Sequence, residues 1–306
     1  MKFLITGGSG FLGSYLISAL QKISKNKIYI IDKKKPKYRS KNIVFIRQDL
    51  NHENHIQLKK YDFDYIFHMA AELGVKNVID NPIYTFDKNY ISTIKVLDFA
   101  KKNKSLKRFF YFSTSEVYSK LNKNGKMSEK DKLFIPDIFH PRTSYWLAKI
   151  IGEFLTINSR LNYTIFRIFN VYGSDNKFTH VIPSIFKKLT SNKKVIFENP
   201  NHERSFLFID DFVEMVIKSL NNKFKNKIIN IGNPSETIKI KDLIKKIKII
   251  TKSKTKYKLK NFPNQSIQKR VPDINEFKKI NYEKFKFTNL NIGLKKIYKK
   301  TNKNQK

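Results

Sequence analysis

Three closely spaced glycines near the start of the chain place the strongest constraint on its fold. An apolar run over residues 2–6 ends at Gly7, and a helical pattern follows Gly10 and Gly13. A strand that turns through such glycines into a helix forms a tight loop, in which backbone N–H groups can approach a pyrophosphate. The helix N-terminus adds a partial positive charge directed at the phosphates. The pattern therefore predicts a dinucleotide-binding loop.

A carboxylate follows this loop at the distance that a dinucleotide site requires. Nineteen residues after Gly13, a second apolar run over residues 28–31 ends at Asp32. A carboxylate at this strand end accepts a hydrogen bond from a ribose 2′-hydroxyl and repels a 2′-phosphate. The lysines at 33–35 could neutralise such a phosphate. We expect the repulsion from Asp32 to outweigh them, because the carboxylate stands at the strand end where the ribose binds. We therefore expect NAD, and not NADP, as the cofactor.

The composition excludes several kinds of site. The 306 residues contain no cysteine, so disulfides and thiolate metal sites are excluded. His52 and His55 lie in a polar stretch and are interpreted as solvated, so we expect no metal. No segment approaches the roughly 20 apolar residues of a membrane span, and the glycine loop interrupts any signal-peptide pattern. We expect a cytoplasmic protein with no membrane partner.

The formal charge of +37 raises the question of nucleic-acid binding. Only 8 of the 62 basic residues are arginine, the residue that reads base edges, and the lysines spread along the whole chain. Lysine, asparagine and isoleucine are abundant together, as AT-rich codon usage would produce. We therefore attribute the charge to composition and do not expect a nucleic-acid partner.

Apolar runs alternate with helical patterns over the first half of the chain. The predicted strands span residues 2–6, 28–32, 43–46, 65–69, 108–113 and 163–169. Predicted helices between them span 85–102 and 144–159. This alternation is typical of βαβ units with right-handed crossovers. It predicts an α/β fold built on a doubly wound parallel sheet.

After Asn170 the pattern changes to a mixture of shorter elements. Strands are predicted at 195–197, 206–208 and 228–231, and helices at 181–190, 210–220 and 240–250. We expect a Rossmann dinucleotide-binding domain over residues 1–172, with later returns near 206–232. Residues 173–306 are expected to form mainly a smaller, mixed α/β substrate-binding lid. The Lys-rich tail, 295–306, is polar and is expected to fray.

Two residues in the middle of the chain predict acid–base chemistry. Tyr145 and Lys149 are four residues apart and so project from the same helix face. A free tyrosine has a pKa of about 10, and a nearby lysine favours the phenolate and lowers that pKa. Ser113, Thr114 and Glu116 follow a predicted buried strand, so their polar groups are expected at the carboxyl end of the sheet.

In this order, the motifs resemble those of the extended short-chain dehydrogenases/reductases, specifically the NAD-dependent nucleotide-sugar epimerase/dehydratase family with its UDP-glucose 4-epimerase-like members. The resemblance covers nearly the whole chain. The motifs that carry it are residues 6–13, Asp32, 49–50, 68–71, Asn89, 113–118, Tyr145 with Lys149, 167–173, 204–211, 230–232 and 270–273.

The resemblance implies a cofactor site, a catalytic group and a substrate site. The residues implied to bind NAD are Gly7, Gly10, Phe11, Leu12, Gly13, Asp32, Asp49, Leu50, Ala70, Ala71, Asn89, Ser113, Tyr145 and Lys149. The implied catalytic residues are Tyr145, Lys149, Thr114 and Glu116, and Thr114 would bind the sugar 4-hydroxyl. Those implied to grip the diphosphate of a nucleotide sugar are Asn170, Arg204 and Arg270.

Two positions depart from the family pattern. Ser119 stands where the family carries a glycine after Val-Tyr, and Ser92 replaces another glycine. Neither change removes a reacting group. His68, within a motif of the resemblance, is interpreted as a packed residue and not as a catalytic one.

The resemblance implies one shared first step with several outcomes. Tyr145 takes the proton of a hexose 4-hydroxyl while hydride leaves C4, which gives a 4-ketosugar. A 4-epimerase returns the hydride to the other face, a uronate decarboxylase loses CO2, and a 4,6-dehydratase removes the C5 proton and eliminates water. A relative that only senses NAD would keep the fold without the chemistry, but such proteins normally lose the tyrosine or the lysine.

Glu116 is the residue that separates these outcomes. It matches the glutamate of the dehydratases and decarboxylases, whereas Ser115 stands where glucose dehydratases carry an aspartic acid. Bacterial proteins regarded as 4-epimerases also carry Thr-Ser-Glu here. We expect a UDP-hexose 4-epimerase, with UDP-glucuronate decarboxylase and NDP-hexose 4,6-dehydratase as the alternatives. The resemblance also implies a homodimer through the helices near 85–102 and 144–159.

Overall fold

The protein is described by a computed structural model. The described residues are 1–23, 26–37, 40–52, 56, 58, 62–118, 125–135, 137–174, 180–191, 194–261, 268–280 and 285–303. His55 and Ser119 lie outside them. The chain divides into two compact units. Unit 1 comprises Met1–Val117, Lys132–Ile168 and Val213–Ile229, and unit 2 comprises Tyr118–Asp131, Phe169–Phe212 and Asn230–Lys306.

Unit 1 contains the strands and helices of an α/β sheet. In chain order they are β1 (Lys2–Thr6), α1 (Phe11–Lys22), β2 (Lys27–Asp32), β3 (Ile43–Arg47), β4 (Tyr65–His68), α2 (Val75–Asp80), α3 (Pro82–Lys101), β5 (Arg108–Thr114), a 3-10 turn (Ser115–Val117), α4 (Thr143–Ile157) and β6 (Tyr163–Ile168). The later segments α6 (Ile209–Lys218), a 3-10 turn (Asn222–Phe224) and β11 (Lys227–Ile231) return to this unit for most of their length.

The sheet has seven strands in the order β11-β6-β5-β4-β1-β2-β3, and each pairing from β6 through β3 is parallel. The predicted doubly wound parallel sheet is confirmed. The strand order reverses at β1, between β2 and β4, and ligands of such sheets bind beyond the carboxyl ends of the strands at this point. The glycine loop follows β1 and is therefore placed at the position where a ligand is expected.

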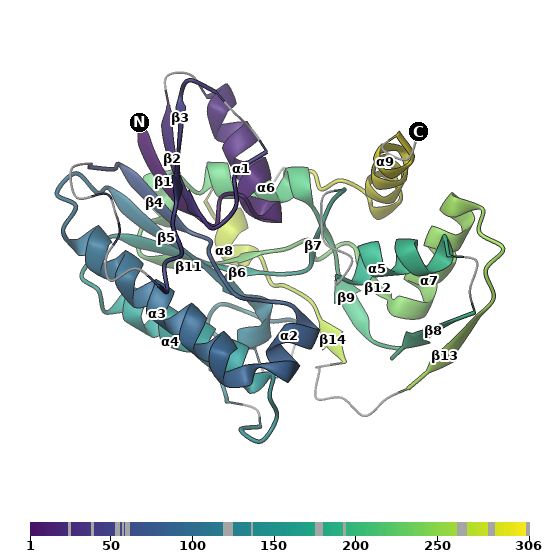
Figure 1. The fold of residues 1–306 in the computed structure, drawn as a ribbon. Coiled ribbons are helices and arrows are strands. Elements are labelled where there is room, and N and C mark those ends of the chain that lie inside the picture. The colour runs from purple at the N-terminus through teal and green to yellow at the C-terminus, as the bar shows by residue number, and fades with distance from the viewer. Residues whose placement is uncertain are drawn as a thin grey trace. The chain divides into compact units, whose positions relative to one another are not determined.

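Alternate residues of the central strands pack against helices on opposite faces of the sheet. On one face, Leu4 and Phe109 belong to a buried cluster with Val96 of α3. On the other face, Phe67 stacks on Phe110 with ring centroids 4.5 Å apart. Figure 1 shows α3 and α4 side by side on one face of the sheet and α1 on the other. Both faces are buried, which explains the nearly continuous apolar runs in the sequence.

Helix α4 is attached to the sheet by a buried ion pair. Nη2 of Arg167 in β6 lies 2.7 Å from Oε2 of Glu153 in α4, and Nε of Arg167 donates to Oε1 at 3.0 Å. Ser113 of β5 donates its hydroxyl to the same Oε1 at 2.5 Å. The residue that precedes Glu153, Gly152, allows close packing, because an added Cβ would lie 1.9 Å from the hydroxyl oxygen of Tyr111. Charge and shape together determine the position of α4.

Unit 2 is built from shorter elements. They are β7 (Val171–Tyr172), α5 (Val181–Leu189), β8 (Val195–Glu198), β9 (Glu203–Ser205), β10 (Leu207–Phe208), β12 (Thr237–Lys239), α7 (Ile240–Thr251), β13 (Tyr257–Lys260), β14 (Lys269–Arg270), α8 (Asn275–Lys278) and α9 (Leu290–Lys303). Strands β12, β9 and β14 form a mixed sheet, with β12 antiparallel and β14 parallel to β9. Smaller two-stranded sheets pair β10 with β7 and β13 with β8.

One expectation about the tail is wrong. Residues 295–303 were expected to fray, but they continue helix α9, which begins at Leu290. Leu290, Leu294 and Ile297 are buried, and Gly293 lies against the Tyr172 side chain, where an added Cβ would come within 2.1 Å of the hydroxyl oxygen. This apolar spacing supplies one packed face, so the lysines between these positions do not prevent a helix.

Some short strands of unit 2 have no sequence signal. Strand β13 alternates lysine with Tyr257 and Leu259, and β14 consists of Lys269 and Arg270. Their pairing partners, and not their own composition, make them strands. Among the described residues, no helix is long and apolar enough to cross a bilayer.

The buried ion pair generates the first prediction. Arg167→Lys keeps the charge but loses the planar fork, so the free energy of unfolding should fall by about 2 kcal/mol. Arg167→Met leaves Glu153 buried without its partner and should cost about 3–5 kcal/mol. Urea titration followed by circular dichroism measures both changes. The control is Arg47→Lys at an exposed position of β3, and equal effects at the two positions would contradict the prediction.

Candidate active site

The glycine loop forms a close contact between β1 and the chain that follows β4. Gly7 has a positive φ of 71°, and an added Cβ would lie 2.7 Å from the backbone nitrogen of Ala70. The N–H of Gly10 donates to the carbonyl of Gly7 at 3.0 Å, which closes the turn. At Gly13 an added Cβ would meet the same carbonyl oxygen at 2.7 Å. Side chains at these positions would fill the loop, so the glycines are required by its geometry.

The same loop presents the first turn of α1. Phe11, Leu12 and Gly13 precede the first intrahelical donor, Ser14, whose N–H donates to the carbonyl of Gly10 at 3.0 Å. Their N–H groups therefore have no acceptor within the helix and point out of its N-terminus. Such an N-terminus attracts an anion through its N–H groups and its dipole. The predicted pyrophosphate cradle fits this backbone.

Asp32 ends β2 beside the loop. Its Oδ2 accepts from the backbone N–H of Ser9 at 3.0 Å, and its Oδ1 accepts from that of Lys34 at 3.0 Å. The carboxylate is thereby oriented at the strand end where the sequence predicts a ribose acceptor. The ammonium of Lys33 lies 3.9 Å from Asp49 and 3.7 Å from Glu72. One of the lysines that could neutralise a 2′-phosphate is thus directed toward two carboxylates.

Asp49 and Leu50 lie after β3. Burial raises the pKa of Asp49, but the backbone hydrogen bond from Asn51 and the charge of Lys33 outweigh it, and the net pKa lies below the usual value. The carboxyl group is therefore an anion at neutral pH. Leu50 is buried in the same cluster as Val96. These residues can offer an acceptor and an apolar wall to a base, as the sequence predicts.

Asn89 holds the loop after β4. Its Oδ1 accepts from the N–H of Glu72 at 3.0 Å, and its Nδ2 donates to the carbonyls of Glu72 and Thr85 at 2.9 and 2.8 Å. This amide therefore positions the segment that carries Ala70 and Ala71. At the departure from the family pattern, the Ser92 hydroxyl donates to the Asn89 carbonyl at 3.2 Å within the helix.

His68 is a buried connector between strand and helix. Its Nδ1 lies 2.8 Å from the Thr6 hydroxyl, and its Nε2 lies 3.1 Å from the Thr93 hydroxyl. Burial, with the charge of Lys149, lowers the pKa of His68 to about 3, so the ring is neutral. This geometry fits the interpretation of His68 as a packed residue.

Tyr145 and Lys149 project from one face of α4 toward the end of β5. The Lys149 ammonium donates to the carbonyl of Phe112 at 2.8 Å and lies 5.0 Å from the ring centre of Tyr111. Burial lowers the pKa of Lys149 to about 8, against the opposing charge of Glu153. A buried ammonium in this position is a strong hydrogen-bond donor for a ligand.

Tyr145 does not ionise readily in the protein alone. Burial raises the pKa of Tyr145 and the charge of Glu116 raises it further, while a hydrogen bond with Thr114 lowers it. The sequence predicts a lowering by Lys149, but burial has the larger effect here. The phenol therefore remains protonated until ligands change its surroundings.

Glu116 is held by two side chains that the sequence analysis did not identify. Nη2 of Arg142 donates to Oε1 at 3.0 Å and to Oε2 at 3.2 Å, and the Trp146 indole N–H donates to Oε2. The backbone N–H of Glu116 donates to the Thr114 hydroxyl oxygen at 3.2 Å. The carboxylate is therefore an anchored anion. Two signals were available: Trp146 is the only tryptophan, and Arg142 is one of eight arginines.

Unit 2 carries the predicted diphosphate-binding residues. Arg204 of β9 and Arg270 of β14 are register partners on parallel strands, and both are buried. Such pairing directs two side chains to the same face of a sheet. Nη1 of Arg204 donates to the carbonyls of Glu203 and Gln268 at 2.8 and 3.0 Å. Two adjacent guanidinium groups on one face form a strong site for phosphate oxygens.

Asn170 lies in the same unit as these arginines. Its Nδ2 donates to the carbonyl of Ser205 at 3.0 Å, at the end of β9. This bond fixes the chain next to Arg204. Nη2 of Arg204 also lies 3.3 Å from Nδ1 of His202, a residue that the sequence analysis did not single out.

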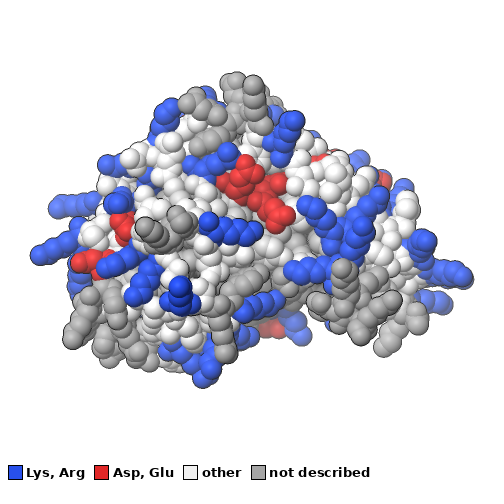
Figure 2. Space-filling model, turned by 90° about the horizontal axis from the view of Figure 1, so that it is seen from above, with Lys and Arg blue, Asp and Glu red and all other residues white. Residues whose placement is uncertain are grey.

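The positive charge is dispersed. On the face seen in Figure 2, Lys and Arg side chains are distributed over the surface, and the largest group of carboxylates lies near its centre. Several lysines pair locally with acids, as Lys107 does with Asp64 at 2.8 Å. Among the described residues, no group of three or more His, Asp or Glu side chains could hold a metal ion.

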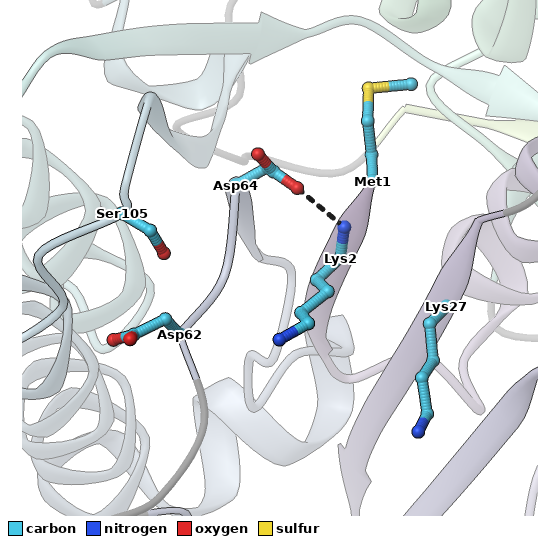
Figure 3. A pocket seen from close by; sticks show the side chains of 6 residues that line it. All are labelled: Met1, Lys2, Lys27, Asp62, Asp64 and Ser105. Carbon is cyan, nitrogen blue, oxygen red and sulfur yellow. Dashed lines mark hydrogen bonds between the residues drawn. The ribbon is translucent and has the colours of Figure 1, made fainter.

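A surface pocket lies at the opposite edge of the sheet (Figure 3). It is lined by Met1, Lys2, Lys27, Asp62, Asp64 and Ser105. Strands β1 and β2 begin at Lys2 and Lys27, so these are the amino ends of the strands. The backbone N–H of Lys2 donates to Oδ2 of Asp64 at 2.8 Å. The Asp64 carboxylate also lies 2.8 Å from the ammonium of Lys107. This pocket is therefore separate from the candidate site.

Comparison with known protein families agrees with this geometry. The family model described as "NAD dependent epimerase/dehydratase family" matches residues 3–232. The chain is 31% identical over 296 residues to a UDP-N-acetyl-alpha-D-glucosaminuronate decarboxylase of Bacillus cytotoxicus, covering 90% of each chain. It is 32% identical over 251 residues to a putative UDP-glucose 4-epimerase of Methanocaldococcus jannaschii, covering 76% of this chain and 77% of that protein.

Solved structures show the same fold. The UDP-glucuronic acid 4-epimerase of Bacillus cereus, in complex with UDP-glucuronic acid and NAD, superposes with a TM-score of 0.87. The two chains are 26% identical, and the match covers 99% of each. The fold of this chain is thus shared with a protein whose structure contains bound NAD.

The geometry of Asp32 generates the second prediction. The protein should bind NAD at least about tenfold more tightly than NADP, because a 2′-phosphate would meet the oriented carboxylate. Asp32→Asn should reduce this preference by weakening NAD binding and relieving the repulsion. Calorimetric titration with both dinucleotides measures it. Asp62→Asn, at an exposed acid near the opposite edge, is the control; tighter NADP binding by the wild type would overturn the prediction.

Proposed function

Because the chain belongs to the NAD dependent epimerase/dehydratase family, we propose that it modifies a nucleotide-diphosphate hexose through a transient 4-keto intermediate. The specific reaction that we propose is 4-epimerisation of a UDP-hexose. The Tyr145–Lys149 pair beside Thr114, next to a glycine loop and Asp32, supports the shared first step. The anchored carboxylate of Glu116 supports the choice of epimerisation.

The proposed first step assigns a role to each side chain at the end of β5. Tyr145 takes the proton of the 4-hydroxyl, and Thr114 hydrogen-bonds both Tyr145 and that hydroxyl. Lys149 holds a positive charge near the phenolate and donates to the nicotinamide ribose. Bound NAD would supply the hydride acceptor for C4 and, in its oxidised form, a second positive charge. A cationic surrounding favours the phenolate and offsets the effect of burial on the Tyr145 pKa.

The surroundings of Glu116 support a reaction without a base at C5. A carboxylate that accepts from a guanidinium and from an indole N–H is stabilised as an anion and loses basicity. The backbone of the same residue orients Thr114, whose hydroxyl oxygen accepts from the Glu116 N–H at 3.2 Å. An epimerase needs no more than this, since the hydride returns to the opposite face of the same ketosugar.

Decarboxylation of a UDP-uronate is the second candidate. The Bacillus cytotoxicus relative supports it by its name and by 31% identity over 90% of both chains. A 4-keto uronate is a β-keto acid and can lose CO2 without a base at C5, so the anchored Glu116 is compatible with this outcome. A 4,6-dehydratase needs an acid for the departing 6-hydroxyl, and the buried Ser115 is poorly suited to that role.

The proposal is tested by incubation of the NAD-loaded protein with UDP-, dTDP- and GDP-linked hexoses and with UDP-glucuronate. Mass spectrometry and NMR identify the products. An unchanged mass with inverted configuration at C4 supports the epimerase. Loss of the mass of CO2 identifies the decarboxylase, and loss of the mass of water identifies the dehydratase.

We place the diphosphate of the substrate on unit 2. Arg204 and Arg270 supply paired donors, and Asn170 fixes the chain next to them. A diphosphate diester carries two negative charges, which matches two guanidinium groups.

A homodimer formed through α3 and α4 is part of the proposal. These two helices pack side by side (Figure 1) and leave large apolar side chains exposed to solvent. Ile83 of α3 is 77% exposed and Phe154 of α4 is 63% exposed. A second copy of the same helix pair would cover both side chains in a symmetric contact.

The third prediction concerns Tyr145. Tyr145→Phe removes the base and retains the ring, so NAD binding should persist while turnover falls at least about 10²-fold. Turnover assays on the identified substrate measure the effect on catalysis, and calorimetric titration with NAD measures the effect on cofactor binding. Lys149→Met should reduce turnover as much and should also weaken NAD binding, because its ammonium serves both groups. Near-normal turnover in Tyr145→Phe would exclude the proposed first step.

The fourth prediction uses Glu116 to separate the outcomes. In an epimerase, Glu116→Gln should lower turnover by less than about tenfold, or about 1.4 kcal/mol of barrier. If Glu116 were an elimination base, the same change should cost about 10²–10⁴-fold. UDP-glucose deuterated at C5 should keep its label in the wild type. Rapid exchange of that deuterium into solvent would favour the dehydratase over the epimerase.

A further inference from the structure

A histidine stands beside the arginine pair of unit 2. The backbone of His202 is fixed at both ends: its N–H donates to the carbonyl of Asn199 at 3.1 Å, and its carbonyl accepts from Ile240 at 3.0 Å. Its ring is half-buried, and Nδ1 lies 3.3 Å from Nη2 of Arg204. His202 is thus held at the edge of the surface that carries Arg204 and Arg270.

The contact with Arg204 determines the protonation state of the ring. A guanidinium can only donate, so Nδ1 of His202 is the acceptor and carries no proton. The proton of the neutral ring is therefore on Nε2. Burial lowers the pKa of His202, and the charges of Arg204 and Arg270 lower it further. Protonation at Nδ1 would break the contact with Arg204 and place three cations together.

The other charged groups of the neighbouring strands are directed elsewhere or are paired. Glu203 of β9 and Lys269 of β14 are register partners, and their charged atoms lie 3.5 Å apart. Lys239 of β12 is paired in register with Glu203 as well. Positions adjacent along a strand point to opposite faces, so this ionic group lies on the other face from Arg204 and Arg270.

Helix α7 begins at Ile240, the residue whose N–H donates to the carbonyl of His202. In its first turns, Asp242 lies 3.7 Å from Lys245. Besides burial, the charges of Arg204 and Arg270 lower the pKa of His202. The charge of the arginine pair therefore dominates the environment of the histidine.

We infer that His202 is a third diphosphate-binding residue, which takes up a proton when a nucleotide sugar binds and so makes binding tighter at lower pH. The inference rests on the proposed function, which places a diphosphate on this surface. The two negative charges of the ligand would offset the positive charge of Arg204 and Arg270. Arg204 would direct donors to phosphate oxygens, and Nδ1 would be released from its present contact.

The released nitrogen can then bind a proton from solvent. An imidazolium next to a diphosphate is stabilised by the opposite charge, so the pKa of His202 rises on binding. Proton uptake and the pH dependence of affinity are two measures of one coupling. The direction of the pH effect on affinity follows from the direction of the pKa change. The pKa of free His202 lies below its ordinary value of 6.5, and binding raises it. Binding therefore strengthens as pH falls from above the pKa of the bound residue to below that of the free residue.

The test uses UDP-glucose with NAD-loaded protein in the Tyr145→Phe background, which prevents turnover. The diphosphate of UDP-glucose is a diester and does not titrate between about pH 5 and 8. Calorimetry in two buffers with different ionisation enthalpies measures the protons taken up. The affinity should rise by about fivefold between pH 7.5 and 5.5, with proton uptake of less than one per site.

His202→Gln keeps a donor but cannot titrate. It should retain binding at pH 7.5, lose the proton uptake and show a nearly constant affinity over this range. His52→Gln, at an exposed histidine of unit 1, is the matched control and should behave as the parent. NMR of the histidine Cε1–H groups gives a second readout: the resonance missing in His202→Gln should titrate at a higher pH when UDP-glucose is bound.

The outcomes separate this inference from the proposed function. If UDP-, dTDP- and GDP-glucose all fail to bind, both are wrong. A different result would overturn only the inference about His202. In that case UDP-glucose binds and Arg204→Gln weakens its binding, but the proton uptake is absent or survives in His202→Gln. The proposed function would then remain.

Discussion

The attachment of α4 to the sheet is the constraint on which the candidate active site depends. Within one helix, Glu153 pairs with Arg167, Gly152 admits the hydroxyl of Tyr111, and Lys149 donates to the carbonyl of Phe112. Each contact reaches β5 or β6. A rotation or translation of α4 would break an ion pair in a buried environment, where the loss of one partner costs about 3–5 kcal/mol. The direction of Tyr145 is therefore determined by contacts that do not touch a ligand.

This arrangement makes Tyr145 a poor base in the protein without ligands. Burial favours the neutral form of both groups, so it raises the pKa of Tyr145 and lowers that of Lys149. Glu116 adds a negative charge near the phenol. A phenol in this environment is not a base, and it becomes one only when positive charge is brought near it. In the proposed mechanism, the positive charge of bound NAD would therefore couple acid–base chemistry to cofactor binding.

The sequence predicts those parts of the fold and site that depend on local constraints. Gly7 and Gly13 were predictable because a Cβ there would collide with backbone, and the central strands were predictable because both of their faces are buried. Helix α9 was missed because the lysines conceal an apolar spacing that becomes informative only when its packing partner, Tyr172, is known. Strand β14 was missed for the same reason, since its pairing with β9 defines it.

Side-chain contacts between distant segments of the chain also could not be predicted from the sequence. Arg142 and Glu116 are 26 positions apart, and no spacing rule connects them. The residues at Tyr145, Lys149, Thr114 and Asp32 were identified by motif, and the assignment of their roles remains a prediction. His202 gave no signal, because a histidine in a polar turn has no periodic or compositional signature.

The placement of arginine shows where this lysine-rich chain needs a planar, bidentate donor. Buried Arg108 donates to the carbonyls of Ser219 and Asn221 at 2.9 and 3.0 Å, and Arg167 binds both oxygens of Glu153. Arg142 donates from one nitrogen, Nη2, to both oxygens of Glu116. A lysine has no planar fork with which to reproduce the contacts of Arg108 and Arg167, since its ammonium is a point charge.

The same reasoning connects the arginines to the choice of reaction. A guanidinium that holds both oxygens of Glu116 keeps that carboxylate ionised and limits its freedom to approach a C5 proton. In the proposed mechanism every outcome passes through the ketosugar, and the groups around this one carboxylate would decide whether a base is available afterwards. In this chain Arg142 and Trp146 both donate hydrogen bonds to the Glu116 carboxylate. In the proposed epimerisation, the contacts of Glu116 with Arg142 and Trp146, and not the presence of Glu116 itself, would therefore determine reactivity at C5.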